Sequence, residues 1–482
     1  MKANSRISQK HYKKIFLLKL SSSVVERNRP LVHSSPSLTL KCIEALLQKR
    51  GDVDVQLVDC YIRKYSIDRL IQVLQESAPD IIVVDINSYE YLTCTNFLKK
   101  FKEHFSTLVI AIGSDPTIRF SNYFEDSDLF QIVLPGEVEK ELICVLDFLD
   151  KGETIDSIRE RYRERFGQYG PVIDNDFDSL PFPTYNQYER KKYCFVYPLR
   201  IRRRVKWGYI LSSRGCPYKC RFCSPAIRKT YGKDFRIRKA SNVVDEIEHL
   251  IRNYKINVIS FEDDNFTTDR LHVEGICNEI LRRKIEIKWI VHARVDNVDF
   301  SLLALMKKAG CELLRFGIES GSSKIIKFIQ KTDRKDWNSK AIQVFQDARS
   351  LKIGTLALFM LGIPTETEED IKDSFNLLNF LDPDFIQIHF FTPYRGSDFY
   401  EELKPLLKIL DENNFYHYAT PLMSFSNVGV EELKKWRKYF YKKFLFRPKN
   451  IIRHVYNYGC FYLFNLDVFF ELLKMRIYLK DE

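Results

Sequence analysis

The chain has 482 residues, of which 45% are hydrophobic and 29% are charged. This balance is typical of a globular protein with sizeable buried cores and excludes a disordered or collagen-like chain. The net charge is +12, but no basic module with interleaved aromatic residues accompanies it, so nucleic acid is not an expected partner.

The cysteines and the apolar segments indicate the setting in which the chain works. Its eleven cysteines are scattered along a long chain, and residues 1–6 carry no signal-peptide apolar core. We therefore expect reduced thiols and a cytoplasmic location. No apolar stretch is long enough to span a bilayer. The apolar run 462–470 is short and is interrupted by Asn465 and Asp467, so we expect it to form a buried helix.

Between residues 13 and 150, short apolar segments alternate with amphipathic ones. This alternation predicts a doubly wound parallel sheet of the flavodoxin or Rossmann type, and we assign residues 1–150 to this domain. Ligands of such sheets lie where the strands end, and Ser114 and Gly136 stand in two of those turns. Strands are expected at 15–20, 53–59, 80–86, 108–113 and 131–134, and helices at 37–50, 67–75 and 136–149.

Residues 151–206 are expected to link this domain to the next. Within them, Leu180-Pro181-Phe182-Pro183 predicts an extended segment, because each proline restricts the residue before it. Alternation resumes near residue 207, where a strand at 209–212 leads into a loop with three cysteines.

That loop, residues 213–223, places Cys216, Cys220 and Cys223 at the spacing C-x3-C-x2-C. Three convergent thiolates without a fourth protein ligand suit an iron–sulfur cluster with one open iron. Structural zinc takes four ligands, and the next cysteine, Cys277, lies far downstream. A zinc site and buried core cysteines are the two alternatives.

Six strand–helix repeats follow one another from residue 207 to residue 400. They predict a full or partial β/α barrel, whose functional residues lie at the carboxyl ends of its strands. Residues 401–482 are rich in aromatic residues and lysine and predict a C-terminal helical region. The strands are expected at 209–212, 257–261, 288–293, 312–319, 355–362 and 385–390.

The cysteine run, with Phe222 directly before its third cysteine, resembles the signature of the radical S-adenosylmethionine (radical SAM) superfamily. The resemblance covers roughly residues 205–400. It implies a partial (β/α)6 barrel and a [4Fe-4S] cluster held by Cys216, Cys220 and Cys223. It also implies that SAM binds the open iron through its amino and carboxylate groups and is cleaved to a 5′-deoxyadenosyl radical. An electron donor of the flavodoxin or ferredoxin type would supply the electron.

The same resemblance suggests which residues hold SAM. Glu262 or Asp263 matches the acidic strand end that holds the SAM amino group, although strand-end acids also cap helices. The remaining matches also occupy positions that could merely begin a helix or end a strand. They are Phe222 beside the cluster, Arg294 after the third barrel strand, Glu319 and Ser320 at the ribose or carboxylate, and Gly362 beside the adenine.

The domain order resembles that of radical SAM proteins with an N-terminal cobalamin-binding domain, in which Ser114 and Gly136 would face the cofactor. No Asp-x-His-x-x-Gly motif is present. Either cobalt has no protein ligand from below, or the domain has lost the cofactor. The resemblance thus implies a cobalamin-dependent methyltransferase acting on an unactivated carbon or phosphorus of a small molecule or peptide. The alternatives are a radical SAM enzyme of cyclisation, rearrangement or oxidation with a degenerate domain, and a non-catalytic sensor.

Overall fold

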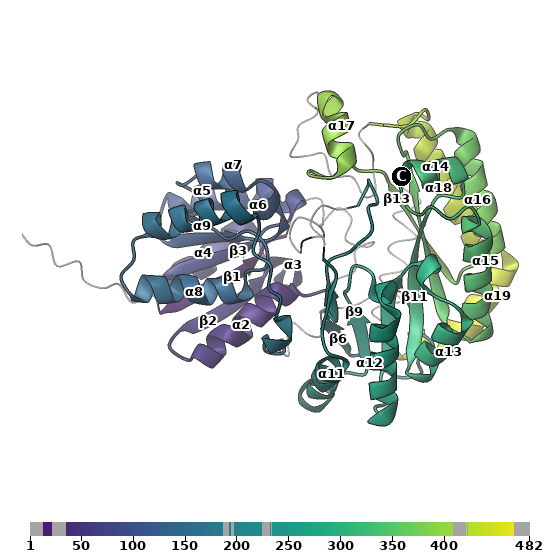
Figure 1. Ribbon diagram of the computed structural model, residues 1–482, viewed down its shortest axis with the longest axis horizontal. Helices are drawn as coiled ribbons and strands as arrows, with labels where there is room; N and C mark the ends of the chain where they lie inside the picture. The colour runs from purple at the N-terminus through teal and green to yellow at the C-terminus, as the bar shows by residue number, and fades with distance from the viewer. Residues whose placement is uncertain are drawn as a thin grey trace, which may run out of the picture. The chain divides into compact units, whose positions relative to one another are not determined.

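A computed structural model of the chain describes residues 13–21, 35–186, 192–193, 197–223, 232, 234–407, 421 and 423–466 (Figure 1). Its contacts divide these residues into two compact units. The first contains residues 13–21, 36–186 and 232, and the second contains residue 35, residues 192–193 and the rest from residue 197 onward. Each unit is built on its own parallel sheet.

The first unit is a five-stranded parallel sheet with the strand order β2-β1-β3-β4-β5. Successive side chains of β1 point to opposite faces, so Phe16 and Leu18 enter one hydrophobic core while Ile15 and Leu17 enter the other. Helices cover both faces (Figure 1), which confirms the doubly wound α/β fold. The strands are β1 (Lys14–Lys19), β2 (Asp54–Asp59), β3 (Ile81–Asp85), β4 (Leu108–Ile112) and β5 (Ile132–Val133).

Local sequence explains where the helices of this unit begin. The hydroxyl of Ser37 accepts a hydrogen bond from Leu40 N at 3.2 Å, and Ser66 caps the next long helix in the same way. The helices are α2 (Leu38–Arg50), α3 (Cys60–Arg63), α4 (Ile67–Ser77), α5 (Tyr91–Lys102), α6 (Ser114–Ile118), α7 (Phe120–Glu125), α8 (Glu139–Asp150) and α9 (Ile155–Tyr169), with short 3-10 turns η2 (Ser88–Glu90) and η3 (Phe177–Ser179).

Helix α9 lies inside the stretch that the sequence analysis takes as a linker. Its Ile158 and Tyr162 are four residues apart and enter the core beneath α8, and the Tyr162 hydroxyl donates to Glu141 Oε2 at 2.8 Å. By their contacts, residues 151–186 therefore belong to the first unit. The other domain limits stay a prediction.

The second unit contains a six-stranded parallel sheet with the order β13-β12-β11-β10-β9-β6. Every strand lies beside its neighbour in the chain, and β6 and β13 are the two ends, so the sheet is a partial (β/α)6 barrel as expected. All six carboxyl ends lie at one edge. The strands are β6 (Trp207–Ile210), β9 (Val258–Phe261), β10 (Lys288–Ala293), β11 (Cys311–Glu319), β12 (Gly354–Leu361) and β13 (Phe385–Phe390); a small pair, β7 (Ser213–Arg214) and β8 (Arg236–Ile237), stands apart.

Helices connect these strands and extend past them. Thr367 and Asp370 form a reciprocal capping box at the start of α16. The connecting helices are α11 (Ala240–Tyr254), α12 (Arg270–Arg282), α13 (Phe300–Lys308), α14 (Ser323–Phe328), α15 (Trp337–Ser350) and α16 (Glu368–Leu381), with turns η5 (Phe266–Thr268) and η6 (Val295–Asn297). The C-terminal helices, also as expected, are α17 (Asp398–Leu407), α18 (Val430–Leu445) and α19 (Pro448–Phe464).

The last part of α19 differs from expectation. Leu463 and Phe464 are 73% and 50% exposed, and Leu466 is 57% exposed. The predicted buried helix at 462–470 is therefore wrong for its described part, while residues 467–470 lie outside the described residues. None of the helices in the described ranges has both the length and the apolar character needed to cross a bilayer.

Candidate functional site

The loop that follows β6 brings the three predicted cysteines together. Cys220 is buried, and Cys223 N donates to Cys220 O at 3.1 Å. Burial raises the pKa of the Cys216 and Cys223 thiols, and the charges of their sister cysteines raise it further. The three sulfurs therefore lie close enough for their charges to interact.

The spacing of these thiols differs from that of a single-ion site. Within the described ranges, no three His, Cys, Asp or Glu side chains are grouped so that they could hold one metal ion. A four-iron cube carries each cysteine on a different iron, so its thiolates are farther apart than those around a single ion. The three thiols of the loop fit such a cube by number and chemistry.

Arg294, which follows β10, holds this loop in place. Its guanidinium lies 3.7 Å from the ring centroid of Tyr218, and its Nη1 donates to Cys220 Sγ at 3.6 Å. The same group forms an ion pair with Asp296 at 2.7 Å and donates to Lys331 O at 2.5 Å. The guanidinium is thus committed to the cysteine loop and its surroundings.

A second arginine secures the end of the loop. Arg221 N donates to Ile329 O at 3.1 Å, and the Arg221 side chain pairs with Glu402 and lies 4.3 Å from the ring centroid of Phe399. The next residue, Phe222, has its ring centroid 5.8 Å from Lys331 Nζ. Phe222 therefore faces a cation at the carboxyl edge of the barrel.

The three acids after β9 have three different environments. Asp263 is buried and accepts hydrogen bonds from Ser212 N, from Ser212 Oγ at 2.8 Å and from Ser213 Oγ. Glu262 accepts from Ser260 Oγ and lies 4.0 Å from the guanidinium of Arg315. Both carboxylate oxygens of Asp263 thus accept hydrogen bonds that fasten the segment after β6 to the end of β9.

Asp264, which the sequence analysis did not select, is an acid whose charge acts on the thiols of the loop. Burial and the neighbouring Asp263 raise the pKa of Asp264 to about 7, and its charge acts on both Cys216 and Cys223. No signal in the sequence separates Asp264 from its two neighbours, because residue 264 lies in a turn after β9.

At the end of β11, Glu319 and Ser320 diverge. Glu319 has φ of +65° and forms an ion pair with Lys331 at 2.9 Å, beside Phe222. Ser320 is fully buried, and its hydroxyl lies 3.1 Å from the Ser374 hydroxyl on α16. Glu319 is thus linked to the cysteine loop through Lys331, and Ser320 contacts α16 instead.

Gly362 ends β12 in a turn closed by Glu366. Gly362 has φ of +83°, and its N donates to Glu366 Oε2 at 2.6 Å. Glu366 is fully buried, and its Oε1 makes no hydrogen bond to a described residue. Burial raises the pKa of Glu366 to about 8, because the two backbone N–H groups that it accepts from do not offset the loss of water.

In the first unit, a buried ionic cluster occupies the point where the strand order reverses. Lys19 at the end of β1 lies 3.4 Å from Asp85 at the end of β3 and 3.0 Å from Glu90, and Ser37 Oγ donates to Asp85 at 2.8 Å. Burial alone would lower the pKa of Lys19, but the two carboxylates raise it above its usual value. Burial raises the pKa of Glu90 to about 7.

Substituting Lys19 with methionine should destabilise the first unit. The change leaves Asp85 and Glu90 buried without their cation, and we expect the free energy of unfolding to fall by about 3 kcal/mol. Urea unfolding followed by circular dichroism measures this loss. Lys49→Met, at an exposed position on α2, is the matched control and should change nothing. Equal stability of the two variants would contradict the role of Lys19 as the cation that compensates Asp85 and Glu90.

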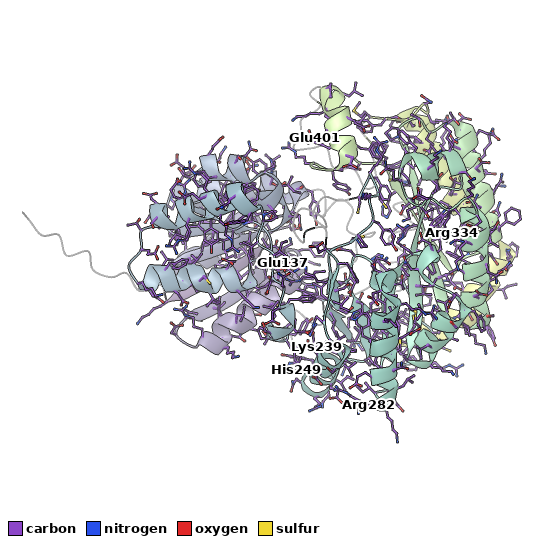
Figure 2. All side chains as sticks on the ribbon, viewed as in Figure 1. Glu137, Lys239, His249, Arg282, Arg334 and Glu401 are labelled. Atoms are coloured by element: carbon purple, nitrogen blue, oxygen red, sulfur yellow. The ribbon has the colours of Figure 1, made fainter. Side chains whose placement is uncertain are left out.

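The two residues of the first unit that were predicted to face cobalamin, Ser114 and Gly136, both contact other residues of that unit. Ser114 Oγ donates to Asn87 Oδ1 at 3.1 Å, so this pair bridges the turns after β3 and β4. Gly136 has φ of +94°, and a Cβ there would stand 2.3 Å from Val172 O. Its neighbour Glu137, labelled in Figure 2, accepts from Asp174 N at 2.9 Å. The chain's own return segment therefore explains the glycine at 136.

Comparison with known proteins shows which family model and which relatives this chain is similar to. Residues 210–378 match the model of the radical SAM superfamily. The chain is 26% identical over 438 residues to an uncharacterized methyltransferase of Pyrococcus horikoshii, covering 89% of this chain and 92% of that protein. It is 25% identical to the anaerobic magnesium-protoporphyrin IX monomethyl ester cyclase of Rubrivivax gelatinosus, covering 88% and 78%.

Solved structures share the fold. The radical S-adenosylmethionine methyltransferase TsrM from Kitasatospora setae, solved with cobalamin and a [4Fe-4S] cluster bound, matches with a TM-score of 0.64 and 16% identity. The match covers 82% of this chain and 75% of TsrM. It therefore includes more of the chain than the barrel alone.

Proposed function

We propose, from the match of residues 210–378 to the radical SAM superfamily model, that the chain is a cobalamin-dependent radical SAM methyltransferase. It acts on an unactivated carbon or phosphorus of a small-molecule or peptide substrate. The observation that carries the proposal is the convergence of the Cys216, Cys220 and Cys223 thiols beside Asp264 at the carboxyl edge of the barrel.

The residues of this edge have distinct roles. When bound, the [4Fe-4S] cluster and SAM supply one-electron cleavage chemistry, and cobalamin supplies a carrier for the methyl group. The three cysteines hold the cluster, and Arg294 and Arg221 keep their loop closed. Asp264 accepts hydrogen bonds from the SAM amino group. Glu319, paired with Lys331, lies at the ribose and carboxylate end, and the backbone at Gly362 lies at the adenine.

Other residues that were predicted to contact SAM are assigned different roles. Asp263 fastens two strand ends, and Ser320 fastens β11 to α16, so we assign both to support rather than to SAM binding. Glu262 is held by Ser260 and Arg315 after the end of β9, and we assign it to the substrate. Arg294 acts on the cluster loop rather than on SAM.

Cobalamin binding belongs to the first unit. Its carboxyl edge at the strand-order reversal, lined by Ser37, Asn87 and Ser114, is where doubly wound sheets bind ligands. The structural neighbour TsrM carries cobalamin. Lys19 is committed to Asp85 and Glu90, so we propose that cobalt receives no ligand from the end of β1. The external reductant is of the flavodoxin or ferredoxin type, and a reducing, cytoplasmic setting suits the cluster.

A second function is favoured by one comparison. A cyclase has the same level of identity to this chain as the methyltransferases, which supports radical cyclisation or oxidation without methyl transfer. Anaerobically reconstituted protein given SAM and a reductant separates the two functions. Methyl transfer yields S-adenosylhomocysteine together with 5′-deoxyadenosine, whereas cyclisation or oxidation yields 5′-deoxyadenosine alone. A cluster spectrum unchanged by SAM would instead favour a sensor.

Asp264→Asn should weaken SAM binding selectively. Loss of a charge-assisted hydrogen bond to the SAM ammonium is expected to raise the KM for SAM by about tenfold or more, while the iron content stays unchanged. Glu262→Gln is the matched control and should leave the KM for SAM within about twofold of the wild-type value. A KM rise in Glu262→Gln but not in Asp264→Asn would reverse the assignment.

A further inference from the structure

Most exposed apolar side chains of this protein lie in one region. Of the seventeen large hydrophobic residues that are exposed in the described chain, ten fall within residues 439–466. Monomeric proteins seldom gather so many exposed apolar side chains in one place without a binding role. They are Tyr439, Leu445, Phe446, Ile451, Ile452, Val455, Tyr456, Leu463, Phe464 and Leu466.

Helix α19 presents an apolar face outward. Ile452, Val455 and Tyr456 are 68%, 64% and 88% exposed, and Leu463 continues the same stripe at helical spacing. The opposite stripe, with Tyr458 and Phe461, is buried against the barrel. No Asp, Glu, Lys or Arg occurs from residue 454 to residue 466. Figure 1 shows α19, in yellow, along the outer side of the second unit.

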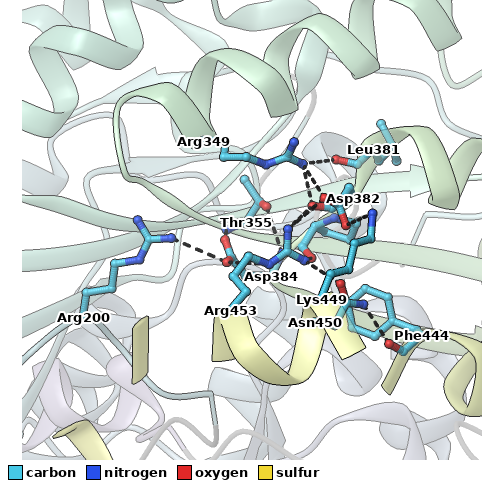
Figure 3. A network of polar contacts seen from close by, with 11 residues as sticks. Arg200, Arg349, Thr355, Leu381, Asp382, Asp384, Phe444, Lys449, Asn450 and Arg453 are labelled. Atoms are coloured by element: carbon cyan, nitrogen blue, oxygen red, sulfur yellow. Dashed lines mark hydrogen bonds and ion pairs between the residues drawn. The ribbon is translucent and has the colours of Figure 1, made fainter. Parts of the chain in front are cut away.

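A polar network fixes the helix in this rotation (Figure 3). Arg453 pairs with Asp382 at 2.9 Å and donates to Pro383 O at 2.6 Å. Lys449, one turn earlier, also pairs with Asp382 at 3.3 Å, and Asn450 donates to Phe444 O at 2.7 Å. Because these contacts hold one side of α19 against the barrel, the helix cannot roll its apolar stripe inward without breaking them.

The sequence of α18 and α19 is basic, although Arg437 is buried and Lys449 and Arg453 are paired with Asp382. Residues 430–466 contain nine Lys and Arg residues but only two Glu and no Asp. Lys442 and Lys443, at the end of α18, are exposed next to Leu445 and Phe446. Exposed aliphatic and aromatic side chains with a basic rim are the composition of helices that lie in the interface of an anionic bilayer.

We propose that α19 and the C-terminal end of α18 form a docking surface for the surface of an anionic lipid bilayer. The aliphatic stripe enters the acyl boundary, the aromatic residues Tyr456 and Phe464 lie at the headgroup level, and the lysines meet lipid phosphates. A second copy of the chain is a poorer occupant, because a two-fold contact would bring two rims of like charge together. The inference does not depend on the proposed methyl transfer.

Flotation of the full, anaerobically purified chain with lipid vesicles tests this surface. We expect binding to vesicles of phosphatidylglycerol and phosphatidylcholine, and much weaker binding to phosphatidylcholine alone. The triple variant Ile452→Ser, Val455→Ser and Tyr456→Ser should lower the partition coefficient by about tenfold or more. Lys442→Ala with Lys443→Ala should also lower it about tenfold, and should reduce its salt dependence.

Matched controls establish specificity. Leu271→Ser with Phe380→Ser removes equally exposed apolar side chains from α12 and α16 and should leave vesicle binding unchanged. SAM cleavage by each variant reports that the barrel is folded. Absence of binding to anionic vesicles would overturn the proposal, as would binding that the triple variant retains. A dimer in sedimentation that the triple variant disperses, with no vesicle binding, would assign the surface to a second copy.

Discussion

Cys220→Ala is expected to abolish SAM cleavage. Cys220 is the buried member of the three thiols, and Arg294 Nη1 donates directly to its sulfur. Without it, two cysteines remain for the cluster, and an iron–sulfur cube held by two thiolates is poorly retained. Formation of 5′-deoxyadenosine by the reconstituted protein should fall by about a thousandfold or more, together with iron and sulfide content.

The control for this loss is another free cysteine. Cys460 is exposed on α19, far along the chain from the loop, and Cys460→Ala should keep full iron content and activity. Cys220→Ser preserves the side-chain volume, so a loss in Cys220→Ser equal to that in Cys220→Ala would arise from the missing thiolate and not from a cavity. SAM cleavage by cluster-free Cys220→Ala protein would refute the site.

The fold could be predicted because its strands are covered on both sides. Residues 81–85 and 108–112 are buried without interruption, and such continuous apolar runs separated by amphipathic helices leave few alternatives to parallel sheets. Helix α9 was missed because it is mostly polar and buries only Ile158 and Tyr162. The proline-rich stretch after it favoured the prediction of a linker over that of a helix.

The cysteines of the proposed site can be selected from the sequence, whereas the carboxylates cannot. Three closely spaced cysteines can serve one cluster whatever the exact loop conformation. The choice among Glu262, Asp263 and Asp264 depends on which side chains find local donors. Only the structure reveals that Ser212 and Ser213 satisfy Asp263. Similarly, Ser320 follows a residue with positive φ, which turns it toward Ser374.

The outward face of α19 could not be predicted from periodicity. An amphipathic pattern states that one face differs from the other, but here both faces of the helix are apolar over residues 455–466. Which face is buried depends on the polar contacts of Arg453 and Lys449 with Asp382. Asp382 lies about seventy residues earlier in the chain, so the local sequence of α19 does not predict these contacts.

Glu366 makes the stability of the barrel depend on pH. It is buried in the turn after β12, near Asp370, whose charge raises its pKa, and Lys324, whose charge lowers it. Its pKa is about 8 in the folded chain, against 4.5 for an ordinary glutamate. The folded state favours the protonated acid. The stability that Glu366 contributes to the folded chain is therefore fully present below pH 4.5 and is lost as pH rises through 8.

Glu366→Gln should therefore stabilise the protein at alkaline pH and not at acid pH. The amide oxygen can still accept from Gly362 N, while the cost of burying an ionised carboxylate is removed. The pKa shift corresponds to about 5 kcal/mol, so at pH 8.5 the melting temperature should rise by about 10 °C relative to the wild type. At pH 5 the two proteins should melt nearly together. Glu369→Gln, an exposed acid on α16, is the control and should not change this pH dependence. A melting-temperature difference that is the same at both pH values would show that Glu366 does not titrate in the folded state.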